Sequence, residues 1–329
     1  GIRDQPRSRG LGDVYKRQQI FSAIRQEGFE RSQAMETVSW LSDVFGPRVT
    51  GTPFIEAAKD WAAERMRRWG LRVYEERFPY GRGWSLERFH AHLIAPQTMP
   101  IIGYPRAWTT STEGVVTADV VRVAISSRDD LDQYRGMLNG KIVLTQPVRP
   151  VEMLECDLVL RLNEKLLADV SQALQGTSEQ KGSGGTGTRL DEYVNRFFVE
   201  EGVVAVLDRG SDMSLVGGAP LGSDLVWPTQ RTDGGTIFVG TGGSRAVDAR
   251  NAVPSATIAV EHYNRLVRLL ELDVPVQVEV NIQTRFHEET RPNGFNLIAE
   301  LPGPVSYTHL RAHETAAELV CRLLREKNE

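Results

Sequence analysis

The chain has few cysteines, no long apolar run and no excess of positive charge. Of its two cysteines, Cys321 lies in a C-terminal tail that is set aside below, so Cys156 stands alone. A disulfide framework and a cysteine-ligated zinc site are therefore excluded, and Cys156 is predicted to be a packed or partly exposed thiol. No apolar stretch is long enough to span a bilayer. A net charge of −4 argues against nucleic acid as the main partner, because phosphate binding needs a basic surface.

Two common signatures of enzymes are missing as well. The sequence contains no Gly-x-Ser-x-Gly turn, which is the usual signal of an α/β serine hydrolase. Gly182, Gly184 and Gly187 have the spacing of the dinucleotide-binding fingerprint, but that fingerprint follows a strand. A polar, helix-like stretch precedes these glycines, and no Gly-Lys-Ser or Gly-Lys-Thr forms a phosphate-binding loop. The favoured interpretation is a flexible surface loop.

What is present is an alternation of helix and strand patterns that is typical of an α/β protein. Apolar residues recur at helical spacing over Ile20–Leu41, with a break at Gly28. Thr52 and Pro53 have the chemistry of a helix start, and Gly70 that of a helix end. The remaining predicted elements are strands over 71–78, 87–95, 115–125, 141–146, 203–207, 256–260, 274–286 and 294–301, and helices over 54–69, 129–138, 162–174, 190–201 and 262–270.

The last predicted strand, Gly294–Leu301, is closed by a Pro-Gly turn that would normally lead into a second strand. From Val305 onward the chain instead continues as polar residues and an amphipathic helical tail. The strand is therefore expected to lack a partner, which a finished domain rarely tolerates. This pattern predicts that the chain is truncated.

The two ends of the chain support this prediction. The chain opens on Gly1, and Gly1–Gln18 shows no apolar periodicity. Leu11–Gln18 and Val305–Thr315 resemble translated library-adapter sequence, and such segments are excluded from fold reasoning. The alternative is a native disordered arm and a native C-terminal helix.

The order of the predicted elements implies a discontinuous first domain with a large insert. We predict a non-native or disordered arm at 1–18 and the N-terminal part of an α/β domain at 19–99. An α/β insert follows at 100–290, then a return strand at 291–304 and an artefactual tail at 305–329.

Several motifs carry a resemblance to a known family. Leu41–Pro53, the helix that ends in Arg-Arg-Trp-Gly-Leu71 and Tyr80–Trp84 resemble the N-terminal region of co-catalytic zinc exopeptidases similar to plasma glutamate carboxypeptidase. Gly294–Gly303 resembles the first strand on return to the peptidase domain.

The insert is similar to the protease-associated domain that such enzymes carry, through Lys141–Thr145, Glu201–Val206 and Val253-Pro-Ser. The resemblance covers Gln19–Pro304. It implies an α/β fold in which an incomplete zinc-peptidase domain is interrupted by an α/β protease-associated insert.

The family's catalytic core would follow this return strand. It comprises a His-x-Asp metal motif, a bridging Asp, a Glu-Glu pair and a distal His, which hold two zinc ions about 3.5–4 Å apart. No residue of this chain matches those positions, so we assign no catalytic and no metal-binding residue, and the substrate-binding residues stay unknown. The resemblance implies two zinc ions in the full-length parent and none bound by this fragment.

Three further patterns resemble sites without matching this family's motifs. His90 and His92 alternate on a predicted strand and could hold a metal with a third ligand, but no carboxylate lies between them, so a structural role is favoured. Glu200 and Glu201 look like the family's Glu-Glu pair, yet they close a helix inside the insert and are predicted to be a solvated helix end.

The third pattern is His309-x3-His313 followed by Glu314, which has the spacing of metal ligands on a helix. It lies in the presumed adapter tail and lacks the Glu that directly follows the first His of the zinc-protease helix motif. A zinc site is not expected there.

Two hypotheses on function follow. The first is a fragment of a zinc-dependent metallo-exopeptidase that acts on dipeptides or peptide ends, is inactive as it stands and is extracytoplasmic or secreted as its relatives are. The resemblance allows a homodimer, a peptide substrate and a contact between Arg82 and a substrate carboxylate, although Arg82 and Trp84 are better explained as staples of a turn. The alternative is a non-catalytic protein-interaction module of the protease-associated type.

Overall fold

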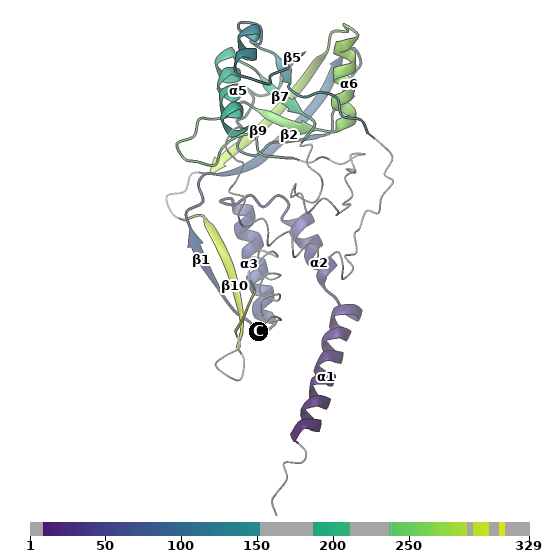
Figure 1. Cartoon of the computed structure of the whole chain (residues 1–329), viewed down its shortest axis with the longest axis vertical. Helices are drawn as coiled ribbons and strands as arrows, with labels where there is room; N and C mark the ends of the chain where they lie inside the picture. Colours follow the sequence, from purple (N-terminus) through teal and green to yellow (C-terminus); the bar gives the residue numbers. More distant parts are fainter. Residues whose placement is uncertain are drawn as a thin grey trace, which may run out of the picture. The chain divides into compact units, whose positions relative to one another are not determined.

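The computed structural model describes residues 9–151, 187–210, 237, 239–287, 292–302 and 309–312. The chain divides into two compact units, a smaller one of Gly1–Arg77 with Phe295–Glu329 and a larger one of Phe78–Gly294 (Figure 1). Helices and strands occur in both, so the α/β class predicted from the sequence is confirmed. Among the described residues, no helix is long and apolar enough to cross a membrane.

Helices form the first part of the smaller unit. α1 (Arg9–Glu30) begins inside the segment predicted as an arm and runs through Gly28, where the sequence predicted a break. A glycine in a helix costs only about 1 kcal/mol relative to alanine, so one glycine does not end this helix. The chain leaves the helix at residues 31–33 instead, and α2 (Ala34–Ser39) and the π-helical turn η1 (Trp40–Val44) follow.

α3 (Pro53–Arg68) ends at the glycine that the sequence singled out. Gly70 has φ +84°, a left-handed conformation that glycine adopts without steric cost. Its N–H donates to the Arg67 carbonyl at 2.9 Å, and the N–H of Leu71 donates to the Met66 carbonyl at 3.2 Å. These two bonds make a Schellman cap, which satisfies carbonyls that the helix end leaves open.

The smaller unit also holds a three-stranded sheet, in which β10 (Gly294–Pro302) lies between β1 (Arg72–Phe78) and β11 (His309–Ala312). β11 runs antiparallel to β10, with Ala299 opposite Ala312. The prediction that β10 lacks a following partner strand is therefore wrong, and so is the helical placement of His309. A strand of four residues is too short to show a clear alternation of apolar and polar residues in the sequence. Such a strand is defined mainly by its backbone hydrogen bonds to the neighbouring strand. The missing partner strand therefore no longer supports truncation of the chain, which stays a prediction.

α3 is joined to the sheet by an apolar cluster and by a charged one. Ala63 of α3 packs with Phe295 and Leu297 of β10. Beside them the Lys59 ammonium lies 2.7 Å from Glu56 and 2.8 Å from Glu75 of β1, and only 9% of the lysine side chain is exposed. Burial works against the charged lysine, but its bonds to the two carboxylates outweigh burial and raise its pKa. The charged cluster therefore ties α3 to β1.

The larger unit is built on an eight-stranded mixed sheet in the order β3-β2-β9-β5-β6-β7-β8-β4. Neighbouring strands from β5 to β8 run parallel, and every other pair of neighbours is antiparallel. Its elements are β2 (Gly83–Ala95), β3 (Met99–Pro100), β4 (Gly103–Pro105), β5 (Val116–Arg122), the 3-10 helix η2 (Asp129–Tyr134), β6 (Ile142–Leu144), α5 (Gly187–Glu201), β7 (Ala205–Asp208), β8 (Ser255–Ile258), α6 (Val260–Glu271) and β9 (Gln277–His287).

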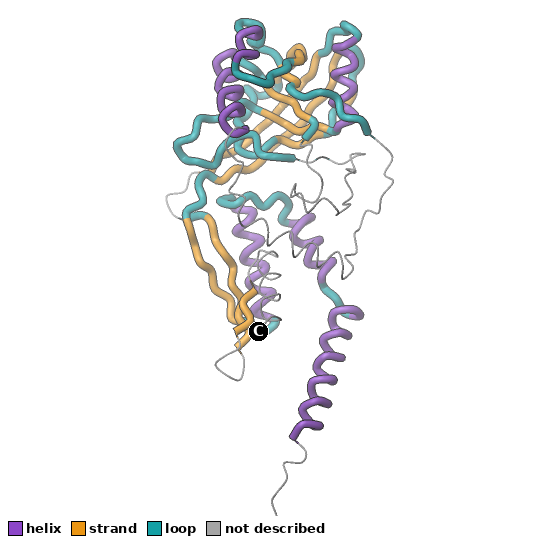
Figure 2. The backbone as a smooth tube through the Cα atoms, in the orientation of Figure 1, coloured by secondary structure: helices purple, strands orange, loops and turns teal. Residues whose placement is uncertain are grey.

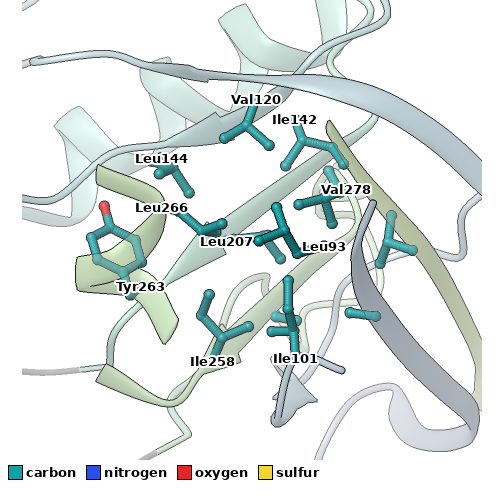
Figure 3. Close-up of a cluster of buried hydrophobic side chains, with 14 of the residues drawn as sticks. Leu93, Ile101, Val120, Ile142, Leu144, Leu207, Ile258, Tyr263, Leu266 and Val278 are labelled. Atoms are coloured by element: carbon teal, nitrogen blue, oxygen red, sulfur yellow. The ribbon is translucent and has the colours of Figure 1, made fainter. Parts of the chain in front are cut away.

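Helices cover the parallel strands on both faces (Figure 2). Side chains alternate between the two faces of a strand, so Ile142 and Leu144 of β6 enter one cluster and Val143 the other. The first cluster includes Tyr263 and Leu266 of α6 and residues of β2 and β9 (Figure 3). The second contains Phe197 and Phe198 of α5.

The units divide after Arg77 and after Gly294, whereas the sequence analysis placed the domain boundaries after residues 99 and 290. The reason is the pairing of β2 with β9, which runs from Gly83 opposite His287 to Ala95 opposite Gln277. This ladder joins β2 to the larger unit. The predicted helix over 162–174 lies outside the described residues. The identity of the larger unit as a protease-associated insert stays a prediction.

Candidate functional site

The segment Tyr80–Trp84, which carries the family resemblance, is held on both sides by other parts of the larger unit. The Asn293 side chain donates to the Gly81 carbonyl at 2.7 Å and accepts from the Tyr80 N–H at 3.3 Å. Gly81 has φ +117°, and a Cβ there would lie 2.4 Å from the Arg245 carbonyl oxygen. Only glycine fits this close approach, so packing requires Gly81 within the sequence Tyr-Gly-Arg-Gly-Trp.

Arg82 is buried, with 6% of the residue exposed, and its guanidinium is engaged inside the protein. It donates to the Asn251 side chain at 3.0 Å and to the Ser244 carbonyl at 3.1 Å, and it lies 4.7 Å from the ring centroid of Phe286. A buried guanidinium with these partners is not presented to a substrate carboxylate at the surface. The geometry favours the structural interpretation of Arg82.

Trp84 links the start of β2 to the segment around Thr109 by a side-chain hydrogen bond. Its indole N–H donates to the Thr109 carbonyl at 2.9 Å, and the indole N–H of Trp108 donates back to the Arg82 carbonyl at 2.8 Å. Trp84 is 2% exposed. The two reciprocal bonds fix the start of β2 against the chain after β4.

His90 and His92 of β2 lie on one face, as the sequence predicted, with their ring centroids 6.0 Å apart. The structure adds a carboxylate that local sequence could not indicate. Glu279 of β9 is directly opposite His92, and its carboxylate lies 3.8 Å from Nε2 of His90. Long-range strand register places these three residues on the same face of the β2–β9 pair.

Glu200 and Glu201 are at the end of α5, as predicted. Glu201 accepts the N–H of Gly136 at 2.6 Å, and Glu200 lies 3.7 Å from Arg196 one turn earlier. Neither carboxylate faces a metal ligand or a base in these contacts. Glu200 is part of a solvated helix end, and Glu201 caps the turn that follows η2.

A buried polar network at the carboxyl ends of β6, β7 and β8 was not found from the sequence. Asp208 is 5% exposed and accepts hydrogen bonds from Thr257 at 2.8 Å and from the Gly210 N–H at 2.7 Å, while Arg106 lies 2.9 Å from its second oxygen. Every oxygen of this carboxylate is thus paired. The signal in the sequence is weak, because Asp208 merely ends an apolar strand pattern.

Tyr263 of α6 extends the same region. Its hydroxyl donates to the Gln146 carbonyl and accepts from the Gln146 N–H, both at 2.8 Å. Burial raises the pKa of Tyr263 to about 12, so it stays a neutral hydrogen-bonding group at physiological pH. The network holds loops in place.

The parallel strands β5, β6, β7 and β8 lie in the sheet in the same order as in the chain. These four strands therefore form no crevice at a reversal of strand order, which is where such sheets bind nucleotides.

The described residues do not contain the metal ligands that the resemblance implies. Among them, no three His, Cys, Asp or Glu side chains are placed as a group that could hold a metal ion. Cys156, Gly182, Gly184, His313 and Glu314 lie outside the described residues. The residues that the structure describes therefore do not fit a co-catalytic zinc pair.

Comparison with solved structures places the fold. A peptidase M28 precursor from Shewanella amazonensis SB2B matches with a TM-score of 0.50 and 21% identity, over 87% of this chain and 54% of its own. The chain shares this fold. It spans about half the length of the solved structures that it matches.

Two other matches are more distant. An aminopeptidase from Aneurinibacillus sp. strain AM-1 matches with a TM-score of 0.38 and 14% identity, over 83% of this chain and 48% of its own. A zinc aminopeptidase from Bacillus subtilis gives a TM-score of 0.39 and 17% identity, over 81% and 46%. No family model and no curated protein matches the sequence.

Proposed function

We propose that this chain is the supporting, non-catalytic part of a zinc-dependent metallo-exopeptidase that cleaves dipeptides or the ends of peptides. The observation that carries the proposal is the match of 87% of the chain to about half of a solved peptidase. The motifs Leu41–Pro53 and Tyr80–Trp84 occur in the order that the resemblance requires. A shared fold does not by itself fix an activity, so the proposal also depends on these motifs.

In this proposal the residues of this chain hold helices and strands in place and do not take part in the reaction. The Trp84 and Arg82 contacts hold the start of β2, and the Lys59 cluster holds α3 against β1. Two zinc ions would act as Lewis acids on the scissile carbonyl and on water, and their ligands would come from residues beyond those described. Selectivity for amino or carboxyl ends would depend on that remaining part, and a homodimer, also part of the proposal, would use contacts of the insert.

A protein-interaction module is the second candidate function. It is favoured by exposed apolar side chains on the helices of the smaller unit, including Phe29, Met35 and Trp40. These side chains lie on the successive helices α1, α2 and η1, and an exposed apolar patch is typical of a surface that binds another protein.

The test is to sequence the source gene across the codons for Gly303–Thr315 without library adapters. The exopeptidase proposal predicts that the reading frame continues into a second apolar strand and a His-x-Asp motif. If the genome instead encodes Val305–Glu329 followed by a stop codon, the exopeptidase proposal is refuted and the interaction module becomes the better account.

A further inference from the structure

The β2–β9 ribbon has an apolar face and a polar face. Ala91 and Leu93 of β2 and the residues opposite them on β9 belong to the buried core. Because side chains alternate along a strand, the residues between them point the other way. That far face carries Ser85, Arg88, His90 and His92 from β2 and Glu279, Asn281, Gln283, Arg285 and His287 from β9.

Two imidazoles and one carboxylate stand together on this polar face. His92 is directly opposite Glu279, and His90 is opposite Asn281. Cβ atoms of directly opposed residues are about 4.5–5.5 Å apart, so the backbone ladder itself keeps these side chains within reach of one another. The side chains of His90 and Glu279 are 35% and 33% exposed, which leaves them accessible to an ion from solvent.

The distances are close to those of a metal site with one ligand turned away. Zinc binds imidazole nitrogen and carboxylate oxygen at about 2.0–2.2 Å, which puts two tetrahedral ligand atoms roughly 3.3 Å apart. Nε2 of His90 and Oε1 of Glu279 are 3.8 Å apart. In the present rotamers the third donor does not join them, in agreement with the lack of a three-residue metal group among the described residues.

His92 is the side chain that would complete the set. Its Nδ1 is buried and has no hydrogen-bond partner within the described part of the chain. A three-ligand site requires a change of the His92 side-chain torsions that turns one ring nitrogen toward Glu279, the residue directly opposite on β9. Two imidazoles and a carboxylate are the protein ligands of several zinc sites that also bind water.

We propose that His90, His92 and Glu279 bind one transition-metal dication such as Zn²⁺, with water completing its coordination. The ion would link β2 to β9 across the polar face of the ribbon. The site is separate from the co-catalytic zinc pair of the proposed function, because the ligands of that pair would come from residues beyond those described.

The experiment is calorimetric titration of the chelator-treated full chain with Zn²⁺, repeated with Co²⁺ to obtain a d–d absorption spectrum. The expected result is one ion per chain and a tetrahedral or five-coordinate cobalt spectrum. His90→Ala, His92→Ala and Glu279→Gln should each weaken binding by about tenfold or more, because even outer partners of a metal ligand are typically worth about 10–100-fold.

Two control variants test whether Zn²⁺ binds at this site or elsewhere on the chain. Arg88→Gln changes the same face of β2 without removing a ligand and should leave the affinity unchanged. His309→Ala combined with His313→Ala removes the histidines of the C-terminal segment and should also have no effect. Circular dichroism of each variant checks folding, and Glu279→Gln is the variant that changes shape least.

Three outcomes overturn the proposal. One is a dissociation constant for Zn²⁺ weaker than about 1 mM in the unmodified chain. The second is unchanged affinity in a folded Glu279→Gln or His90→Ala variant. The third is loss of binding only in the His309 and His313 double variant, which would place the ion elsewhere.

Discussion

The two compact units use the same kinds of elements but enclose their apolar side chains to different extents. In the larger unit Ile142, Val143 and Leu144 are fully buried, because β6 has a helix layer on each face. In the smaller unit Ile24 of α1 and Met35 of α2 are 62% and 78% exposed. A central strand with both faces covered forms a closed core, whereas a helix with an exposed apolar face leaves surface that another element can cover.

The comparison also separates two uses of charge. The larger unit buries Asp208 with every oxygen paired, and the smaller unit keeps its main charged cluster, around Lys59, at the junction of α3 and β1. In neither case do the contacts form a catalytic pair. In the larger unit the buried carboxylate is satisfied within the sheet region, whereas in the smaller unit the charged cluster joins a helix to a strand.

The largest expected difference in unfolding free energy is between two Ile→Ala variants, one in each unit. Ile142→Ala should lower the free energy of unfolding by about 2–5 kcal/mol, because it removes fully buried methylene and methyl groups from the core. Ile24→Ala changes a side chain that is 62% exposed and should stay within about 0.5 kcal/mol. Urea unfolding followed by circular dichroism measures both. Equal losses would show that the two units do not differ in burial.

A smaller loss is expected when the buried carboxylate is neutralised. Asp208→Asn keeps the shape but weakens the hydrogen bonds to charged and polar partners, so unfolding should become easier by about 1.5–3 kcal/mol. The matched control is Asp119→Asn, which removes an exposed ion pair with Lys141 and should change the urea midpoint much less. A larger shift in the control than in Asp208→Asn would contradict the assignment of the network as a structural anchor.

The tryptophan staple provides a prediction of about 1 kcal/mol. Trp84→Phe keeps an aromatic ring but removes the N–H that donates to Thr109, and a net hydrogen bond is worth about 0.5–1.5 kcal/mol. Trp69→Phe, at a residue 55% exposed in the smaller unit, is the control and should be close to neutral. Thermal and urea unfolding of both variants tests whether the reciprocal bonds matter.

The smallest effect concerns pH. His262 accepts the Ile102 N–H at 3.0 Å, and burial, together with Arg265, lowers its pKa despite the opposing charge of Glu261. The neutral form is thus favoured in the folded state, so its contribution to stability is complete above the ordinary pKa of 6.5 and is lost as pH falls from there toward the lowered pKa. The urea midpoint of the unmodified chain should fall over this range more than that of His262→Gln. Identical pH profiles would refute the role of His262.

Local signals explain what could be predicted from the sequence. The end of α3 was found because Gly70 adopts a left-handed conformation that the sequence marks, and β10 because an apolar run is bounded by glycine and proline. The predicted break at Gly28 is wrong because one glycine costs a helix only about 1 kcal/mol relative to alanine, and α1 continues through it.

Long-range pairing explains what could not be predicted. The position of Glu279 opposite His92 and the partners of Asp208 both depend on register between strands far apart in the chain. The burial of Arg82 has the same origin, since its partners are about 160 residues away in sequence. A periodic pattern within one segment carries no information on these contacts.

The most direct test of the account is a peptidase assay of this chain with added Zn²⁺, on aminoacyl p-nitroanilides and on dipeptides. The account predicts no hydrolysis above the buffer rate, because the described residues supply supporting contacts and no co-catalytic ligand set. Hydrolysis that follows the purified chain through chromatography and is abolished by a chelator would contradict it.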